Sequence, residues 1–210
     1  MAKTPSTQDF LEFDQIRDGI IILKNKSLRM VLMVSSINLA LKSDEEREAI
    51  LFQFQDFLNS LDFPCQILIQ SRRLNITGYL DGLKEIEKKE TNELLKAQIE
   101  EYRNFIKELL GGGQIMQKTF YVIVPFFLSE VKMLKKQKFS KHFNLTEELF
   151  QRAKTQLLQR VEFVSLGLRS CGLQSVPLNT LELVELFWTL HHQAEAEHGY
   201  YPEFPPELTK

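Results

Sequence analysis

Apolar residues near the start of the chain are arranged in a way that predicts two strands, a helix and a third strand. β-branched and aliphatic side chains fill residues 19–24 and 27–35, and the short polar pair Asn25-Lys26 between them suits a tight hairpin. Apolar positions recur at helical spacing after Ser43 and alternate again over residues 66–70. The first 72 residues therefore predict a β-β-α-β order.

The expected helix has a clear start and stop. Ser43 is followed three residues later by Glu46, which is the spacing of a capping box, and Pro64 disfavours helical geometry in the residue before it. The apolar stripe between these two signals consists of Ile50, Phe54, Phe57, Leu58 and Leu61. This stripe predicts a helix that packs one face against a core.

Residues 79–110 form a charged segment with eight acidic and six basic residues. Its second half keeps a narrow apolar seam at helical spacing, formed by Leu95, Ile99, Tyr102, Ile106 and Leu109. We expect a long helical arm, either bent near Thr91-Asn92 or folded as a hairpin, that projects from the sheet. Gly111 and the two glycines after it should end this arm, because glycine accepts left-handed caps freely.

The last third of the chain predicts one more strand and two helices. Residues 119–127 are the most strand-like run, and Pro125 within them indicates an edge strand or an early strand end. Asn144 with Glu147, and Asn179 with Glu182, have the spacing of helix starts. The apolar face of the first of these helices consists of Phe150, Ala153, Leu157, Val161, Val164 and Leu168.

Together these elements predict an α+β fold. Residues 1–190 should form one domain with a small mixed sheet of about four strands, in the order β-β-α-β-α-β-α-α. Residues 191–210 should be a polar, proline-rich tail. A length of 210 residues fits one such domain.

Charge, cysteine count and apolar runs exclude only a few classes of protein. The formal charge of −2 provides no overall field that would attract nucleic acid or an anionic membrane, so any such contact must be local. Cys65 and Cys171 match neither a disulfide framework nor the spacing of zinc ligands, and reduced thiols are the expectation. The first residues lack an apolar targeting core, and nowhere do enough apolar residues run together to span a membrane. We expect a cytoplasmic protein.

The residue types needed for catalysis are not arranged in any recognised pattern. The glycines that begin at Gly111 are followed by Gln114, Ile115 and Met116, so the lysine and hydroxyl of a phosphate loop are missing. His191 and Glu195 are four residues apart, but a frayed polar helix end is the alternative to a metal site. We expect no catalytic, cofactor-binding or metal-binding residues and no enzyme activity, although a site assembled only in three dimensions stays open.

Two surface features are candidates for binding. Arg72 and Arg73, after a strand, suit acidic groups of a partner, with ordinary solvated arginine as the alternative. A second group mixes lysines with apolar side chains and suits an anionic membrane surface or a nucleic-acid backbone, with a solvated loop as the alternative. Its lysines are Lys132, Lys135, Lys136, Lys138 and Lys141.

The sequences of several segments, and their order along the chain, resemble those of a known family. These segments are FDQIRDGIIILKNKSLRMVLMVSSINLALKS, EREAILFQFQDFLNSLDFPCQILIQSRRLNITGYL, TNELLKAQIEEYRNFI, KTFYVIVPFF and LRSCGLQSVPLNTLELVELFW. Over residues 10–190 they resemble the TraC-like amino-terminal domain of conjugation and type IV secretion ATPases. In that family a motor domain with nucleotide motifs follows, and the protein works at the inner face of the cytoplasmic membrane.

The resemblance implies a docking role without the chemistry of the motor. The catalytic residues of the family have no counterpart in this chain, so none is carried over. We expect a stand-alone, non-enzymatic adaptor that binds a separate motor ATPase, inner-membrane channel components or neighbouring copies. The seam residues Leu95, Ile99, Tyr102 and Ile106, with Arg72 and Arg73, are its expected partner-binding residues. The alternative function is binding of nucleic acid or an anionic membrane through the lysines of residues 132–141.

Overall fold

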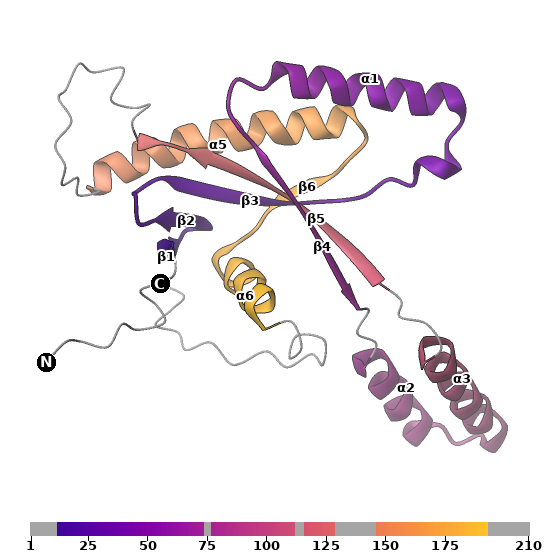
Figure 1. The fold of residues 1–210 in the computed structure, drawn as a ribbon. Coiled ribbons are helices and arrows are strands. Elements are labelled where there is room, and N and C mark those ends of the chain that lie inside the picture. The colour runs from indigo at the N-terminus through magenta and orange to yellow at the C-terminus, as the bar shows by residue number, and fades with distance from the viewer. Residues whose placement is uncertain (1–11, 74–76, 112–115, 129–145, 193–210) are drawn as a thin grey trace, which may run out of the picture. The chain divides into compact units, whose positions relative to one another are not determined.

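The computed structural model describes residues 12–73, 77–111, 116–128 and 146–192, and its α+β fold agrees with the expectation (Figure 1). The strands are β1 (Phe13–Arg17), β2 (Ile20–Leu23), β3 (Leu28–Val34), β4 (Gln66–Arg73), β5 (Met116–Phe126) and β6 (Ser175–Pro177). The helices are α1 (Asp44–Ser60), α2 (Thr77–Lys89), α3 (Glu93–Gly111), α5 (Glu147–Ser170) and α6 (Thr180–His191), with a short 3₁₀ helix at Leu39–Leu41.

The described residues divide into two compact units. Unit 1 comprises residues 12–69 and 119–184, and unit 2 comprises residues 70–118 and 185–192 where the structure describes them. In the described part of the chain, no helix is both long enough and apolar enough to cross a bilayer.

The sheet has the strand order β1-β2-β3-β5-β4, and β6 pairs with β3 beside this path. The pairings of β1 with β2, β2 with β3, β3 with β5 and β3 with β6 are all antiparallel, where we expected a mixed sheet. β5 pairs along the whole of β3, from Leu28 opposite Phe126 to Val34 opposite Phe120. The other edge of β3 is therefore shared by β2 at one end and β6 at the other.

Two strands were not expected from the sequence. β1 is a mostly polar strand at the sheet edge, and β6 is only three residues long and ends at Pro177. The sequence nevertheless contained a signal for β1, namely the pair Asp18-Gly19. In the structure these two residues have positive φ angles of 54° and 71°. An Asp-Gly pair is typical of the tight two-residue turn that joins β1 to β2.

Of the two expectations for Pro125, the edge strand was wrong and the early strand end was right. β5 lies between β3 and β4, and Pro125 stands opposite Arg29 in the pairing with β3. Proline cannot donate a ladder hydrogen bond, and the carbonyl of Pro125 accepts a side-chain hydrogen bond from Arg160 Nη1 at 3.0 Å. The strand continues only to Phe126, so the proline lies next to its end.

One main core lies between the sheet and the α1–α5 layer of unit 1. All six residues of the expected α5 face are buried in it. Sheet residues from β2, β3 and β5, among them Ile22, Leu32 and Val124, form the opposite wall. The helical periodicity of α5 thus corresponds to a buried face, as expected.

The helix starts agree with the sequence in two cases of three. Ser43 accepts a hydrogen bond from Glu46 N and Glu46 returns one to Ser43 N, which completes the capping box of α1. Asn179 and Glu182 exchange the same pair of bonds at α6. The expected cap Asn144 was wrong, because α5 begins at Glu147 with Thr146 in the capping position. Asn144 itself lies outside the described residues.

Candidate functional site

The charged segment folds as a helical hairpin, one of the two forms expected. α2 and α3 contact each other and are joined by a turn at residues 90–92. The Glu90 carboxylate accepts hydrogen bonds from the backbone N–H groups of Asn92 and Thr91, which lowers the pKa of Glu90. Asn92 Oδ1 then accepts from Leu94 N at 3.0 Å and so caps α3. The turn residues therefore satisfy the backbone groups where the arm reverses.

Two side-chain contacts join the helices of the hairpin. The hydroxyls of Tyr79 and Tyr102 lie 3.3 Å apart, and this hydrogen bond raises the pKa of Tyr79. Arg103, which sequence spacing would pair with Glu100, instead forms an ion pair with Glu87 across the hairpin. Apart from these contacts the hairpin has no core of its own, because none of its described side chains is buried.

The expected seam residues lie on the apolar side of α3. Ile99 and Ile106 are half-buried, whereas Leu95 and Tyr102 are exposed. Beside them, further apolar side chains face solvent, with Leu94 73% and Phe105 57% exposed. Neither residue was predicted as a binding residue from the sequence, although both extend the seam at helical spacing. The hairpin thus exposes a wider apolar surface than the seam alone.

Arg72 is held within unit 2. Its guanidinium donates a hydrogen bond to the hydroxyl of Thr189, a buried residue of α6. Two residues earlier, Gln70 is buried, and its Oε1 has no hydrogen-bond partner within the described structure. The side chain of Arg73 lies outside the described residues, so its expected role stays a prediction.

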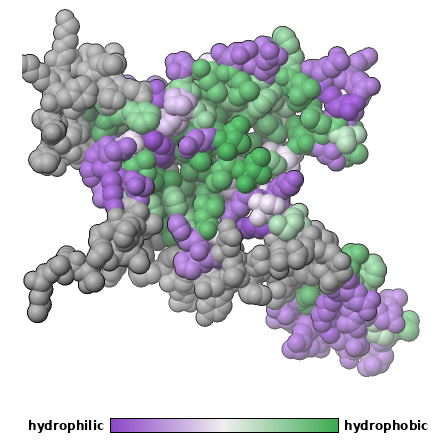
Figure 2. Space-filling view, in the orientation of Figure 1, coloured by the Kyte–Doolittle hydropathy of each residue, from purple (hydrophilic) through white to green (hydrophobic). Residues whose placement is uncertain are grey.

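β4 also carries exposed apolar side chains, at the last position in the sheet order. Ile67 and Ile69 are 60% and 57% exposed and point to the same side of the strand. On α1, Leu51 and Phe52 are exposed as well. Figure 2 shows extensive hydrophobic surface on unit 1, below the hydrophilic outer side of α1. Unit 1 therefore exposes apolar side chains in addition to those of the hairpin.

A pocket of about 270 Å³ lies in unit 1 between β1 and the start of α5. It is lined by Asp14, Gln15, Arg17, Ile22, Lys26, Glu147 and Phe150. None of these residues was predicted from the sequence as a site residue. Arg17 and Glu147 are far apart in the chain, and no local pattern links them.

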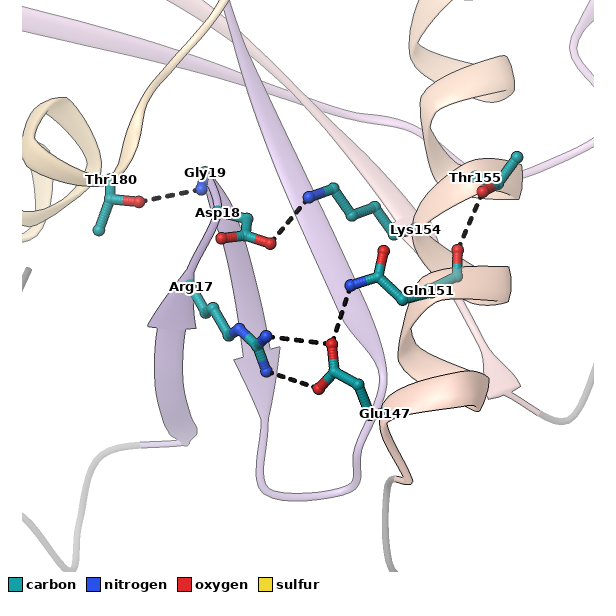
Figure 3. Close-up of polar contacts among 8 residues, drawn as sticks. All are labelled: Arg17, Asp18, Gly19, Glu147, Gln151, Lys154, Thr155 and Thr180. Atoms are coloured by element: carbon teal, nitrogen blue, oxygen red, sulfur yellow. Dashed lines mark hydrogen bonds and ion pairs between the residues drawn. The ribbon is translucent and has the colours of Figure 1, made fainter. Parts of the chain in front are cut away.

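Charged groups in and beside this pocket are paired with one another (Figure 3). Arg17 donates two hydrogen bonds to Glu147, of 2.9 and 3.1 Å, and its guanidinium lies over the ring of Phe150. Lys154 bonds to Asp18 at 2.8 Å. The hydrogen bond from Arg17 lowers the pKa of Glu147, and the one from Lys154 lowers the pKa of Asp18.

Hydrogen bonds of the same cluster connect the β1–β2 turn to two helices. Asp18 is bound to α5 through Lys154, and Gly19 N donates to Thr180 Oγ1 at the start of α6, at 3.0 Å. Gly19 also lies close to the Leu178 carbonyl, where an added Cβ would be 2.9 Å from the oxygen. We interpret these contacts as structural, because each charged group is already neutralised by a neighbour.

Several other expected sites have no described structure to test them. The lysines of residues 132–141, Gly112 and Gly113, and Glu195 lie outside the described residues. His191 is exposed at the end of α6, and the ring of His192 stacks on Trp188 with centroids 4.8 Å apart. Among described residues, no group of three or more histidine, cysteine, aspartate or glutamate side chains is placed to hold a metal ion.

Of three comparisons with known proteins, one assigns the chain to a family. No curated protein and no solved structure matches the chain. The family model of the archaeal TraC-like domain matches residues 14–190, which include every helix of the described fold except the last residue of α6, and nearly all of the sheet. The chain therefore belongs to the archaeal TraC-like domain family.

Proposed function

We propose that the chain is a non-enzymatic docking domain of a conjugation or type IV secretion-like machine. In this role it binds a motor ATPase or inner-membrane components of the machine. Membership of the TraC-like family supports the link to conjugation and secretion. The docking role goes beyond the family match and is argued from the exposed side chains of the two units.

One observation carries the docking role: large apolar side chains in both units lie outside the core. They include Ile67 and Ile69 on β4, and Leu94 and Phe105 on the hairpin. Scattered exposed apolar residues are normal, but groups of them on one strand or one helix pair mark interaction surfaces. The end position of β4 in the sheet order adds a strand edge that a partner can extend.

The chemistry of the described pocket supports a non-enzymatic role. Its acidic and basic groups are held in ion pairs with one another, which fits a structural role for these charges. The pKa values of Glu147 and Asp18 are lowered, which favours fixed carboxylates rather than groups that exchange protons near neutral pH.

The test is recovery of tagged protein from its native cells in mild detergent, with the bound proteins identified by mass spectrometry. We expect a secretion-type ATPase or inner-membrane channel component to be recovered with the wild-type chain. An Ile67→Glu, Ile69→Glu variant should lose much of this binding. A Leu166→Glu variant, with an exposed apolar side chain on α5, is the control. Recovery of nucleic acid or lipid alone would refute docking and favour the lysines of residues 132–141.

A further inference from the structure

We infer that the apolar face of the α2–α3 hairpin binds the same face of a second copy of the chain, forming a four-helix bundle. This inference rests on the proposed function, in which the hairpin is a contact surface, and it names the occupant of that surface. The hairpin face is defined by Tyr79, Ile86, Leu94, Tyr102, Phe105 and Leu109, all of which are exposed.

These six side chains form one surface on one side of the hairpin. On α3 the half-buried residues Ile99 and Ile106 mark the side that packs toward α2. At 100° per residue, Leu94, Phe105 and Leu109 occupy the side of the same apolar arc that is turned away from them. The hydrogen bond between Tyr79 and Tyr102 brings the exposed edge of α2 beside that of α3.

The size of the hairpin face matches what a stable dimer needs. An aromatic side chain offers about 150–250 Å², and the six residues are between 45% and 73% exposed. Their combined exposed area is on the order of 700 Å², close to the roughly 800 Å² that each partner contributes to a standard interface. A single hairpin cannot cover this area itself, whereas two hairpins packed face to face form the core of a four-helix bundle.

Charged side chains border the hairpin face on both helices. Glu101 and Glu108 flank Phe105 on the open side of α3, and Lys89 flanks Ile86 on the open side of α2, next to the turn. All three are exposed, and none forms an ion pair within the described part of the chain. Acidic and basic side chains therefore border the hairpin face on its two outer edges.

The same charges favour a second copy over a strongly charged partner. Residues 79–110 carry eight acidic and six basic residues, a net charge of −2, so two copies repel each other only weakly. An isologous interface also needs one self-complementary surface, and the hairpin has acidic and basic flanks on the same face.

The test is sedimentation equilibrium of the purified full chain across a concentration series. We expect wild-type protein to have twice the mass of one chain, and a Leu94→Glu, Phe105→Glu variant to dimerise at least about a hundredfold more weakly. Leu51→Glu, Phe52→Glu is the matched control, since it changes the same residue types at exposed sites on α1. A monomeric wild type, a dimeric hairpin variant or a monomeric control would each overturn the inference.

This test involves no other protein, so a monomeric chain that still recovers a secretion ATPase from cells would overturn the dimer and leave the proposed function standing. A dimer that recovers no such component would do the reverse.

Discussion

The ring of Phe57 on α1 lies directly against the Cα of Gly167 on α5. A Cβ atom added to Gly167 would be 2.1 Å from Phe57 Cδ2 and 2.6 Å from Cε2, far inside normal contact distance. Phe57 is buried in the main core of unit 1. α1 can therefore approach α5 this closely only because α5 has no side chain at that position.

This contact predicts that Gly167→Ala destabilises the protein, although alanine is the better helix former. The added methyl group must push the buried ring of Phe57 out of place, and overpacking of this kind costs about 1–3 kcal/mol. Chemical denaturation measures the change in the free energy of unfolding. A variant as stable as the wild type would show that α1 and α5 separate easily.

Gly82→Ala is the matched change at an open position and should have the opposite effect. Gly82 lies within α2, and a Cβ added there meets nothing within 4 Å. Alanine at such a site should stabilise the helix by about 0.5–1 kcal/mol, because glycine loses more backbone entropy when it becomes helical. Far-UV circular dichroism during thermal unfolding measures this gain, and a loss of helix stability would contradict it.

Local patterns in the sequence correctly predicted the elements whose environment is set nearby in the chain. The buried face of α5 could be predicted because its six apolar residues repeat at the helical period and all pack in one core against the sheet. The capping boxes of α1 and α6 could be predicted because each depends on only two residues, three positions apart in the sequence. Such features need no knowledge of distant segments.

Features that depend on distant segments could not be predicted. β6 is a strand only because it pairs with β3, and nothing in three residues ending in proline indicates this. The pairing of Arg17 with Glu147 likewise requires the fold to bring β1 to the start of α5. The hairpin face was predicted only in part, because the exposure of Leu94 and Phe105 depends on which side of α3 contacts α2.

Asn179→Ala should destabilise the start of α6. The Asn179 side chain accepts a hydrogen bond from Glu182 N at 3.0 Å, and loss of such a cap costs about 1 kcal/mol. Asn59→Ala is the control, since Asn59 is an exposed residue near the end of α1. Equal unfolding free energies for the two variants would mean that the cap contributes nothing.

The Arg17–Glu147 pair should make stability depend on acidity. The folded-state pKa of Glu147 is lowered, chiefly by the hydrogen bond from Arg17, so the stabilisation is present above the ordinary carboxylate pKa. It is lost as the pH falls through the lowered folded-state pKa. Denaturation at a series of pH values should show a shallower acid loss for Glu147→Gln than for the wild type. Parallel curves would mean that the pair does not affect stability.

The thiol of Cys65 should react slowly in the folded protein. Cys65 is half-buried, and burial raises its pKa, although the positive charge of Arg160 opposes this. Less thiolate at neutral pH means slower attack on a disulfide reagent. Replacing Arg160 by methionine should slow the reaction further, and labelling kinetics with a chromogenic disulfide measure both rates. Reaction of Cys65 at the rate of an unfolded chain would contradict the burial.

The position of β6 has a consequence for how the protein is made. β3 leaves the ribosome well before β6, and in the described structure part of its second edge is covered by β6. Until residue 177 has been synthesised, that edge remains open to other nascent chains, and unpaired strand edges promote aggregation. Pairing segments so distant in the chain is also slow. The domain should therefore complete its sheet only late in translation.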